Sequence, residues 1–235
     1  MTKRAKVYVY IVSAIGVLAF ASGLWSPPWP HDPLRFGFYF MLSLLAATLK
    51  LRLPGLTGTM SIGFVFVLLG IAEMSLPETM LVACTGIVVQ CFWRAVRRPG
   101  AMQVVFNVAA AAISVVLAYQ PAHFVQARWH TGSIPILMAL ATCIYFVASS
   151  LLVSGVLSRV ESRPLREVWE RCYLLSFPYY LVGGVVAGLV AASSHELGWQ
   201  LPLSILPVMG GAFLFCRMYF ARLMAPVPVE APAHR

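Results

Sequence analysis

The chain alternates long apolar segments with short polar breaks. The segments are about 20 residues long, which matches the hydrocarbon core of a bilayer. They are apolar on all sides, whereas the strands of a membrane barrel alternate apolar and polar positions. Backbone inside lipid must satisfy its own hydrogen bonds, so such segments predict helices. Eight spans are predicted, at residues 7–25, 34–49, 59–76, 77–93, 101–119, 134–157, 173–192 and 203–220.

Composition excludes an ordinary soluble domain. Of the 235 residues, 60% are hydrophobic and only 11% are charged, whereas about a quarter of a soluble domain is charged. We therefore expect an all-α, polytopic integral membrane bundle of about eight transmembrane helices. The bundle is predicted to occupy residues 1–224 as one domain. Residues 225–235 are proline-rich and are predicted to form a disordered cytoplasmic tail.

The basic residues predict the orientation. Fifteen of the seventeen Lys and Arg residues lie on one side of the predicted spans, in alternate gaps and at the two chain ends, and only Arg35 and Arg128 lie on the opposite side. Basic residues near span ends stay on the cytoplasmic side during insertion, so both termini are predicted to be cytoplasmic. The net charge of +9 is spread over five short gaps. This spread favours anionic lipid headgroups as its partner rather than nucleic acid.

Two segments outside the helical cores need interpretation. Basic residues, an apolar stretch and the string at residues 19–21 (AFA) resemble a signal peptide. The apolar stretch continues to Trp25, so we expect a retained span; cleavage would leave seven spans. Residues 120–133 are predicted to form the longest outer loop. Residues 163–172 place apolar and charged side chains on opposite helix faces, which predicts an amphipathic helix at the membrane surface.

Ionisable and amide side chains within spans are the candidate ligand-binding residues, because polar groups there are costly and usually functional. Glu73 lies near the outer end of the third span, and Arg35 opens the second span at the same level. A structural ion pair between them is favoured over a ligand or proton site. Gln90 and Asn107 lie at similar depth in the inner half. An interhelical hydrogen bond between these two amides is favoured over a polar ligand lining.

Small residues and prolines in the last two spans indicate packing and kinks. Gly184 and Gly188 form a small-xxx-small pattern, which allows close helix approach. Packing within the bundle is favoured over a dimer face. Pro178 and Pro207 are expected to kink the seventh and eighth spans.

Several kinds of chemistry have no signature here. The zinc-protease arrangement, the serine elbow, the phosphate loop and paired catalytic carboxylates are all missing from the sequence. All five histidines are predicted to lie in loops or the tail, which leaves no intramembrane haem ligand. The five cysteines follow no metal-binding spacing. We therefore expect a non-enzymatic protein without a cofactor, a metal site or a disulfide.

Seven short strings carry a resemblance to a known group of proteins. They are residues 53–61 (LPGLTGTMS), 75–78 (SLPE), 89–94 (VQCFWR), 103–107 (QVVFN), 168–172 (VWERC), 176–183 (SFPYYLVG) and 217–223 (RMYFARL). Together they resemble the multi-span membrane region at the N-terminus of some bacterial signalling proteins. In those proteins, HD-GYP phosphodiesterase or GGDEF cyclase domains for cyclic di-GMP follow the last span. This chain ends soon after Arg222, so we expect a free-standing membrane relative without an output domain.

Three functions follow as hypotheses. The first is a bacterial inner-membrane sensor or receptor-like module that acts through a protein partner. The second is the substrate-binding membrane subunit of a small-molecule importer, with an outer cavity lined by residues such as Glu73, Arg35 and Trp29. The third is an accessory subunit of a larger membrane complex, whose apolar faces contact neighbouring chains. A homo-oligomer is also compatible with the sequence.

Overall fold

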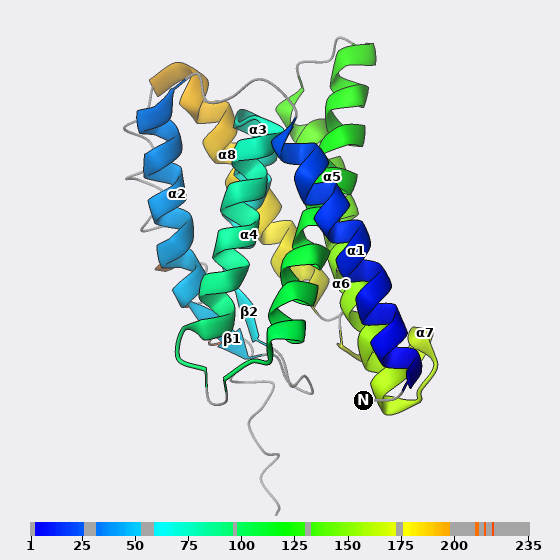
Figure 1. Cartoon of the computed structure of the whole chain (residues 1–235). Coiled ribbons are helices and arrows are strands. Elements are labelled where there is room, and N and C mark those ends of the chain that lie inside the picture. The colour runs from blue at the N-terminus through cyan, green and yellow to red at the C-terminus, as the bar shows by residue number, and fades with distance from the viewer. Residues whose placement is uncertain are drawn as a thin grey trace, which may run out of the picture.

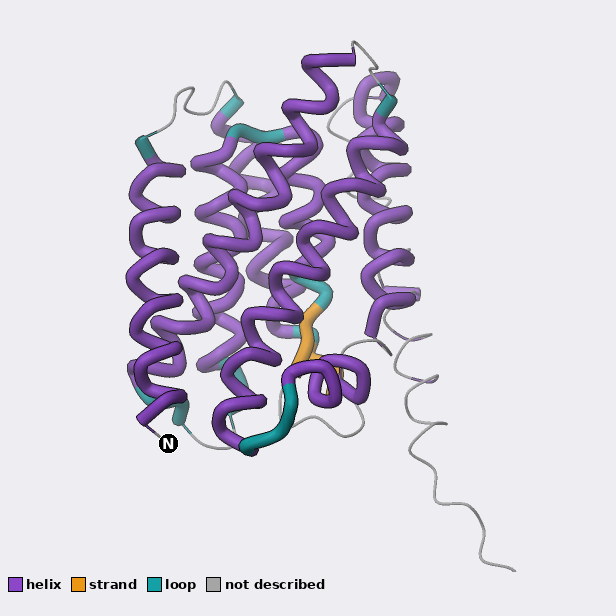
Figure 2. The backbone as a smooth tube through the Cα atoms, turned by 90° about the vertical axis from the view of Figure 1, so that its right-hand side faces the viewer, coloured by secondary structure: helices purple, strands orange, loops and turns teal. Residues whose placement is uncertain are grey.

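The structure is a computed structural model that describes residues 3–25, 32–52, 59–95, 98–129, 133–172 and 176–197, with the single positions 210, 211, 214 and 218. Its helices lie side by side as a bundle (Figures 1 and 2). The elements are α1 (Lys3–Leu24), α2 (Pro33–Thr48), β1 (Lys50–Arg52), β2 (Thr59–Ser61), α3 (Phe64–Glu73), α4 (Leu76–Phe92), α5 (Ala101–Trp129), α6 (Ile134–Glu161), α7 (Leu165–Cys172) and α8 (Phe177–Leu197). The predicted eighth span, with Pro207, and the predicted tail lie outside the described residues, apart from the four single positions.

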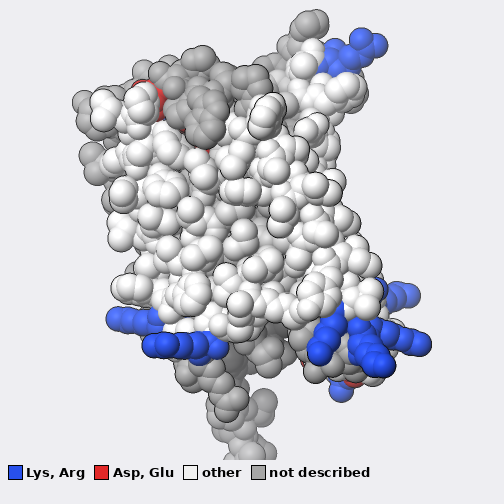
Figure 3. All heavy atoms as spheres, viewed as in Figure 1, with Lys and Arg blue, Asp and Glu red and all other residues white. Residues whose placement is uncertain are grey.

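The apolar helices fit a membrane-embedded, multi-pass protein. Among the described residues, α1, α5 and α6 are long and apolar enough to cross a membrane, while α2, α3, α4 and α8 are shorter apolar helices. Large hydrophobic side chains are exposed along the bundle, for example Leu18, Met41 and Leu189. Figure 3 shows a wide band without charged side chains across the face of the molecule that it draws. A surface of this kind is stable against lipid and unfavourable in water.

The two ends of the bundle differ in charge. Lys and Arg side chains gather at one end, which is at the bottom of Figure 3. This basic end carries Lys3, Arg4, Lys6, Lys50, Arg94, Arg98, Arg159, Arg163 and Arg166. The opposite end, called the far end below, carries Asp32, Arg35, Glu73, Glu78 and Arg128. This division follows the alternation of basic gaps along the sequence.

The described chain is helical, as expected, apart from a short β-hairpin of two three-residue strands between α2 and α3. β1 and β2 pair antiparallel, with Leu51 opposite Met60. The third span was predicted as one helix over residues 59–76, whereas α3 begins only at Phe64. Ten helical residues rise about 15 Å, which is half the thickness of a bilayer core. The part before α3 consists of β2 and a turn at residues 62–63. Non-helical backbone of this kind is tolerated at membrane depth only when protein surrounds it.

Protein does surround this passage. α3 packs against α2, α4, α5, α6 and α8, and every residue from 64 to 71 is buried. Gly63 lies against α2, where an added Cβ would come 3.7 Å from the Cα of Ala47. A helix enclosed by other helices has no polar face, which is why α3 resembles a lipid-exposed span in the sequence.

α5 is longer than predicted. Residues 120–133 were expected to form a loop, but α5 continues through Pro121 to Trp129. A proline inside a helix removes one backbone hydrogen bond and weakens the helix at that point. Ala122 is buried beside it, and the ring of His123 bonds to the carbonyl oxygen of Ile71. These tertiary contacts hold the helix together past the proline.

The glycines of α8 pack inside the bundle, as favoured from the sequence. A Cβ added to Gly184 would lie 2.4 Å from Oγ1 of Thr142 on α6, and one added to Gly188 would lie 3.4 Å from Cγ of Met138. Pro178 was expected to kink a helix, and this prediction is wrong because of where Pro178 lies in α8. Pro178 lies in the first turn of α8, which begins at Phe177, and a proline there displaces no intrahelical hydrogen bond.

α7 confirms the predicted amphipathic helix near residues 163–172. Val168 is buried, and Nε1 of Trp169 donates a hydrogen bond of 2.9 Å to Oγ of Ser150 on α6. The exposed face carries an ion pair of 2.7 Å between Arg166 and Glu170. The hydrogen bond and charge of Glu170 raise the pKa of Arg166 above its ordinary value. α7 therefore rests on the basic end with its apolar face turned inward.

Candidate functional site

Polar side chains from several helices meet at the far end of the bundle. We call the group formed by Arg35, Tyr39, Glu73, Tyr119 and His123 the far-end cluster. α2 supplies the first two residues, α3 supplies Glu73, and α5 supplies the last two. Arg35, Tyr39 and Glu73 connect α2 with α3, and Tyr119 and His123 connect α5 with the end of α3.

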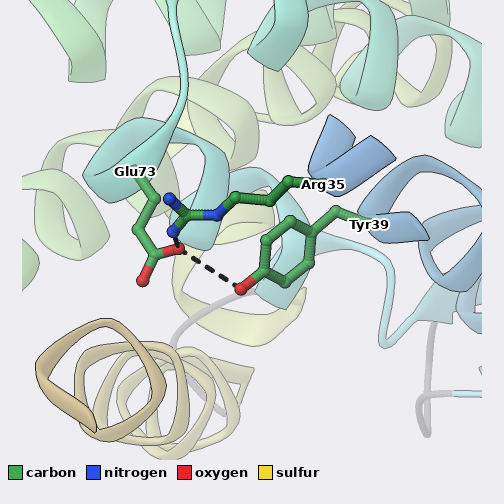
Figure 4. A network of polar contacts seen from close by, with 3 residues as sticks. All are labelled: Arg35, Tyr39 and Glu73. Carbon is green, nitrogen blue, oxygen red and sulfur yellow. Dashed lines mark hydrogen bonds and ion pairs between the residues drawn. The ribbon is translucent and has the colours of Figure 1, made fainter. Parts of the chain in front are cut away.

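An ion pair forms the centre of the cluster (Figure 4). Nη2 of Arg35 contacts Oε2 of Glu73, and the hydroxyl of Tyr39 donates a hydrogen bond of 3.3 Å to the same oxygen. The Glu73 side chain is only 3% exposed, whereas that of Arg35 is 36% exposed. The guanidinium group lies 5.8 Å from the centre of the Tyr39 ring. The carboxylate is thus buried, and its counter-ion reaches solvent.

Local structure at the start of α2 positions Arg35. Asp32 caps the helix by accepting hydrogen bonds of 3.1 Å from the backbone N–H groups of Leu34 and Arg35. Pro33 occupies the first helical position, where its fixed φ suits a helix start. Arg35 and Tyr39 are four residues apart and therefore lie on the same helix face. This spacing lets both side chains reach one carboxylate on α3.

The side chains of α5 bind the end of α3. The last carbonyl groups of a helix have no partner within the helix. Nε2 of His123 lies 2.8 Å from the carbonyl oxygen of Ile71, and the hydroxyl of Tyr119 donates a hydrogen bond of 3.1 Å to the carbonyl oxygen of Met74. Because a carbonyl only accepts, the proton of the imidazole is on Nε2. The rings of Tyr119 and His123 stack with centroids 4.1 Å apart.

Glu78 has a local structural role at this end. Its Oε2 accepts hydrogen bonds from the backbone N–H of Ser75 at 2.8 Å and from the Ser75 hydroxyl at 2.6 Å. These bonds cap the start of α4 in the manner of a capping box. An acidic residue in the first turn also complements the helix dipole. Glu78 is therefore a buried carboxylate that bonds within its own helix start, unlike Glu73.

Gln90 and Asn107, which were predicted to pair, each form a hydrogen bond with another element. The hydroxyl of Ser61 donates a hydrogen bond of 3.1 Å to Oε1 of Gln90, which joins β2 to α4. Nδ2 of Asn107 donates to Sγ of Cys91 at 3.4 Å, which joins α5 to α4. The similar depth of the two amides follows from their positions in the sequence, whereas the hairpin that brings Ser61 to Gln90 does not. Both bonds lie toward the basic end, away from the far-end cluster.

The far-end cluster is a junction that can be opened by small changes. Replacing Glu73 with a neutral residue removes the charge that holds Arg35, and an anion that binds Arg35 competes with Glu73 for the same donor. Arginine offers five N–H donors, and Nη2 of Arg35 is the nitrogen that contacts Oε2 of Glu73. Either change loosens the bond between α2 and α3. The chemistry available here is therefore ion binding at an interface between helices.

The pairing of Arg35 with Glu73 was predicted from the sequence, but the other three members of the cluster were not. Tyr39 follows Arg35 by one helical turn, and this spacing was the available signal. Tyr119 and His123 show the same spacing, but they were assigned to the end of a span and to a loop. Trp29, predicted to line an outer cavity, lies outside the described residues.

Comparison with known proteins gives no relative. The chain matches no family model, and searches of curated proteins and of solved structures return no significant match.

Proposed function

We propose that this chain is a non-enzymatic, multi-pass protein of the bacterial inner membrane that serves as a sensor or receptor-like module for a protein partner. About eight crossings and cytoplasmic termini are part of the proposal. The gathering of Lys and Arg at the basic end supports this orientation. The far-end cluster then lies toward the outer side of the membrane, and α7 lies at the cytoplasmic surface.

The observation that carries the proposal is the buried carboxylate of Glu73, which is bound across a helix interface by Arg35 and Tyr39. Charged groups within membrane helices are costly and mark functional positions by default. This pair joins two helices at the end that faces the outside, so an outer stimulus reaches it first. A ligand acts on the protein only through a difference in its affinity for two states. Here the two states are the closed and open ion pair. The partner is expected at the cytoplasmic surface, beside α7.

Crosslinking in native membranes followed by affinity capture of the tagged chain tests the proposal. We expect one cytoplasmic or membrane protein to be captured in fixed proportion. We expect Glu73→Gln to change its recovery at least severalfold and Glu78→Gln to leave it unchanged. Both substitutions remove one buried carboxylate charge at the same end, but only the first breaks a contact between helices. Wild-type membranes that yield no specific partner would count against the proposal.

A substrate-binding subunit of an importer is the second candidate. The discontinuous passage made of β2 and α3 favours it, because transporters often place substrate sites where a membrane helix is interrupted. Native mass spectrometry of the protein released from its membrane with bound lipids tests this function. An importer subunit is expected to carry one small solute per chain, and Arg35→Met is expected to lose it. If the chain is instead a sensor, we expect the same spectra to show a bound protein partner.

A further inference from the structure

α3 is the most enclosed element of the described chain. Residues 64–71 are all buried, and the helix contacts five others. Close-packed interiors deform little and shift between discrete arrangements rather than bending continuously. A short helix held on all sides therefore moves as one piece. Its two ends face different parts of the bundle, with Phe64 at its start and Glu73 at its end.

The far end of α3 is held by side chains from two neighbouring helices. Arg35 and Tyr39 of α2 bind the Glu73 carboxylate. His123 and Tyr119 of α5 bind the backbone carbonyls at the helix terminus. The first pair of contacts depends on the charge of Glu73, and the second pair does not. A change in that charge therefore alters the hold of α2 on α3 while α5 keeps its contacts.

The other end of α3 leads to α7 through a series of aromatic rings. The centroid of Phe64 lies 4.5 Å from that of Tyr180 on α8. Tyr180 lies 5.1 Å from Phe146 on α6, and Phe146 lies 6.4 Å from Trp169 on α7. The Trp169 indole also donates its hydrogen bond to Ser150. Offset and edge-to-face ring pairs at these separations contribute directional packing energy beyond buried area.

We propose that α3 is a rigid connector that couples the opening of the Arg35–Glu73 pair to the packing of α7 against α6. When the pair opens, α3 shifts, the contact of Phe64 with Tyr180 changes, and α7 loosens from α6. This coupling would carry a signal from the far end to α7 within the protein, and its role as a signal rests on the proposed sensor function. The coupling itself is a property of this chain alone and is measurable without any partner.

The exposure of α7 reports the coupling. Val168 is 3% exposed and faces the bundle, so a thiol at that position is protected while α7 is seated. The probe is the full-length protein in lipid vesicles, with its five native cysteines replaced and Val168→Cys introduced. The rate of maleimide labelling measures how often α7 lifts. We expect Glu73→Gln to raise that rate about 2- to 30-fold, the range that coupling energies between distant sites produce.

Two further variants make the test specific. Within the part of the chain that the structure describes, Glu78 forms its hydrogen bonds at its own helix start. Glu78→Gln is therefore the matched control and is expected to leave the labelling rate unchanged. Phe64→Leu keeps an apolar side chain but removes the ring contact. In that background we expect Glu73→Gln to cause no further increase. Equal effects of Glu73→Gln and Glu78→Gln, no effect of either, or an undiminished effect in the Phe64→Leu background would each overturn the connector.

A second measurement tests the same coupling without the cysteine variant, in case that variant does not fold. The fluorine resonance of 5-fluorotryptophan at Trp169, assigned by its loss in Trp169→Phe, is expected to shift in Glu73→Gln and to stay in place in Glu78→Gln. An unmoved resonance in both overturns the proposal. A negative result here leaves the capture of a partner untouched, and a missing partner leaves this coupling untouched. The two proposals therefore fail independently.

Discussion

Replacing Arg35 with methionine is expected to destabilise the bundle more than replacing Glu73 with glutamine. The reason is the unequal burial of the two partners. Arg35→Met leaves the carboxylate of Glu73 in a site where it is only 3% exposed, so its charge stays without compensation. Glu73→Gln leaves the guanidinium of Arg35, which is 36% exposed and can be hydrated.

The size of the difference follows from the cost of a lone buried charge. Removing one partner of a fully buried ion pair costs about 3–5 kcal/mol. Because Arg35 is partly solvated, screening reduces its share, and we expect about 2–3 kcal/mol for Arg35→Met. For Glu73→Gln we expect about 1 kcal/mol, since an amide oxygen still accepts a hydrogen bond. Replacing both residues with methionine is expected to recover part of the loss, because no charge is then buried alone.

Equilibrium unfolding of the purified protein in mixed micelles, titrated with a denaturing detergent, measures these differences. The four proteins of the cycle are wild type, the two single variants to methionine and the double variant, with Glu73→Gln as an additional protein. The coupling energy of the cycle is expected to be favourable by about 1–2 kcal/mol. A coupling energy of zero, or a greater cost for Glu73→Gln than for Arg35→Met, would refute the reasoning.

Three further substitutions test the packing. Gly184→Ala is expected to cost about 1–3 kcal/mol of stability, because its Cβ would lie 2.4 Å from Oγ1 of Thr142. Gly37→Ala is expected to be neutral or stabilising, because there is open space around Gly37. The same unfolding titration compares the two variants, and equal costs would contradict the packing of α8 on α6. Trp169→Phe removes the hydrogen bond to Ser150 and is expected to cost about 1 kcal/mol of stability. It is also expected to raise the rate of proteolysis within α7. An unchanged rate would show that other contacts hold α7 on the bundle.

The sequence was sufficient for features that depend on local composition. Apolar length predicted the helical membrane class, and the face pattern of residues 163–172 predicted α7, which the structure places at Leu165–Cys172. The shared level of Arg35 and Glu73 predicted their pairing, because a buried charge needs a counter-ion. The spacing of Gly184 and Gly188 predicted close helix contact. In each case, the residues themselves carry the physical reason.

Features that depend on tertiary contacts could not be predicted in this way. A helix enclosed by protein and a helix exposed to lipid are both apolar all round, so the sequence did not separate α3 from a full span. Pro121 usually ends a helix, but the bond from His123 to Ile71 holds α5 beyond it. Tyr39 became part of the cluster only when α2 and α3 were placed side by side. Sequence distance conceals such contacts.

The most direct test of the account is the side of the membrane that each end of the bundle faces. In cysteine-free protein expressed in intact bacterial cells with a permeable outer membrane, Arg128→Cys and Arg98→Cys each add one thiol, at the far end and the basic end respectively. A membrane-impermeant maleimide is predicted to label the Arg128→Cys protein at once. The Arg98→Cys protein is predicted to react only after the inner membrane is opened. Labelling in the reverse order, or of both thiols from outside, would contradict the central claim.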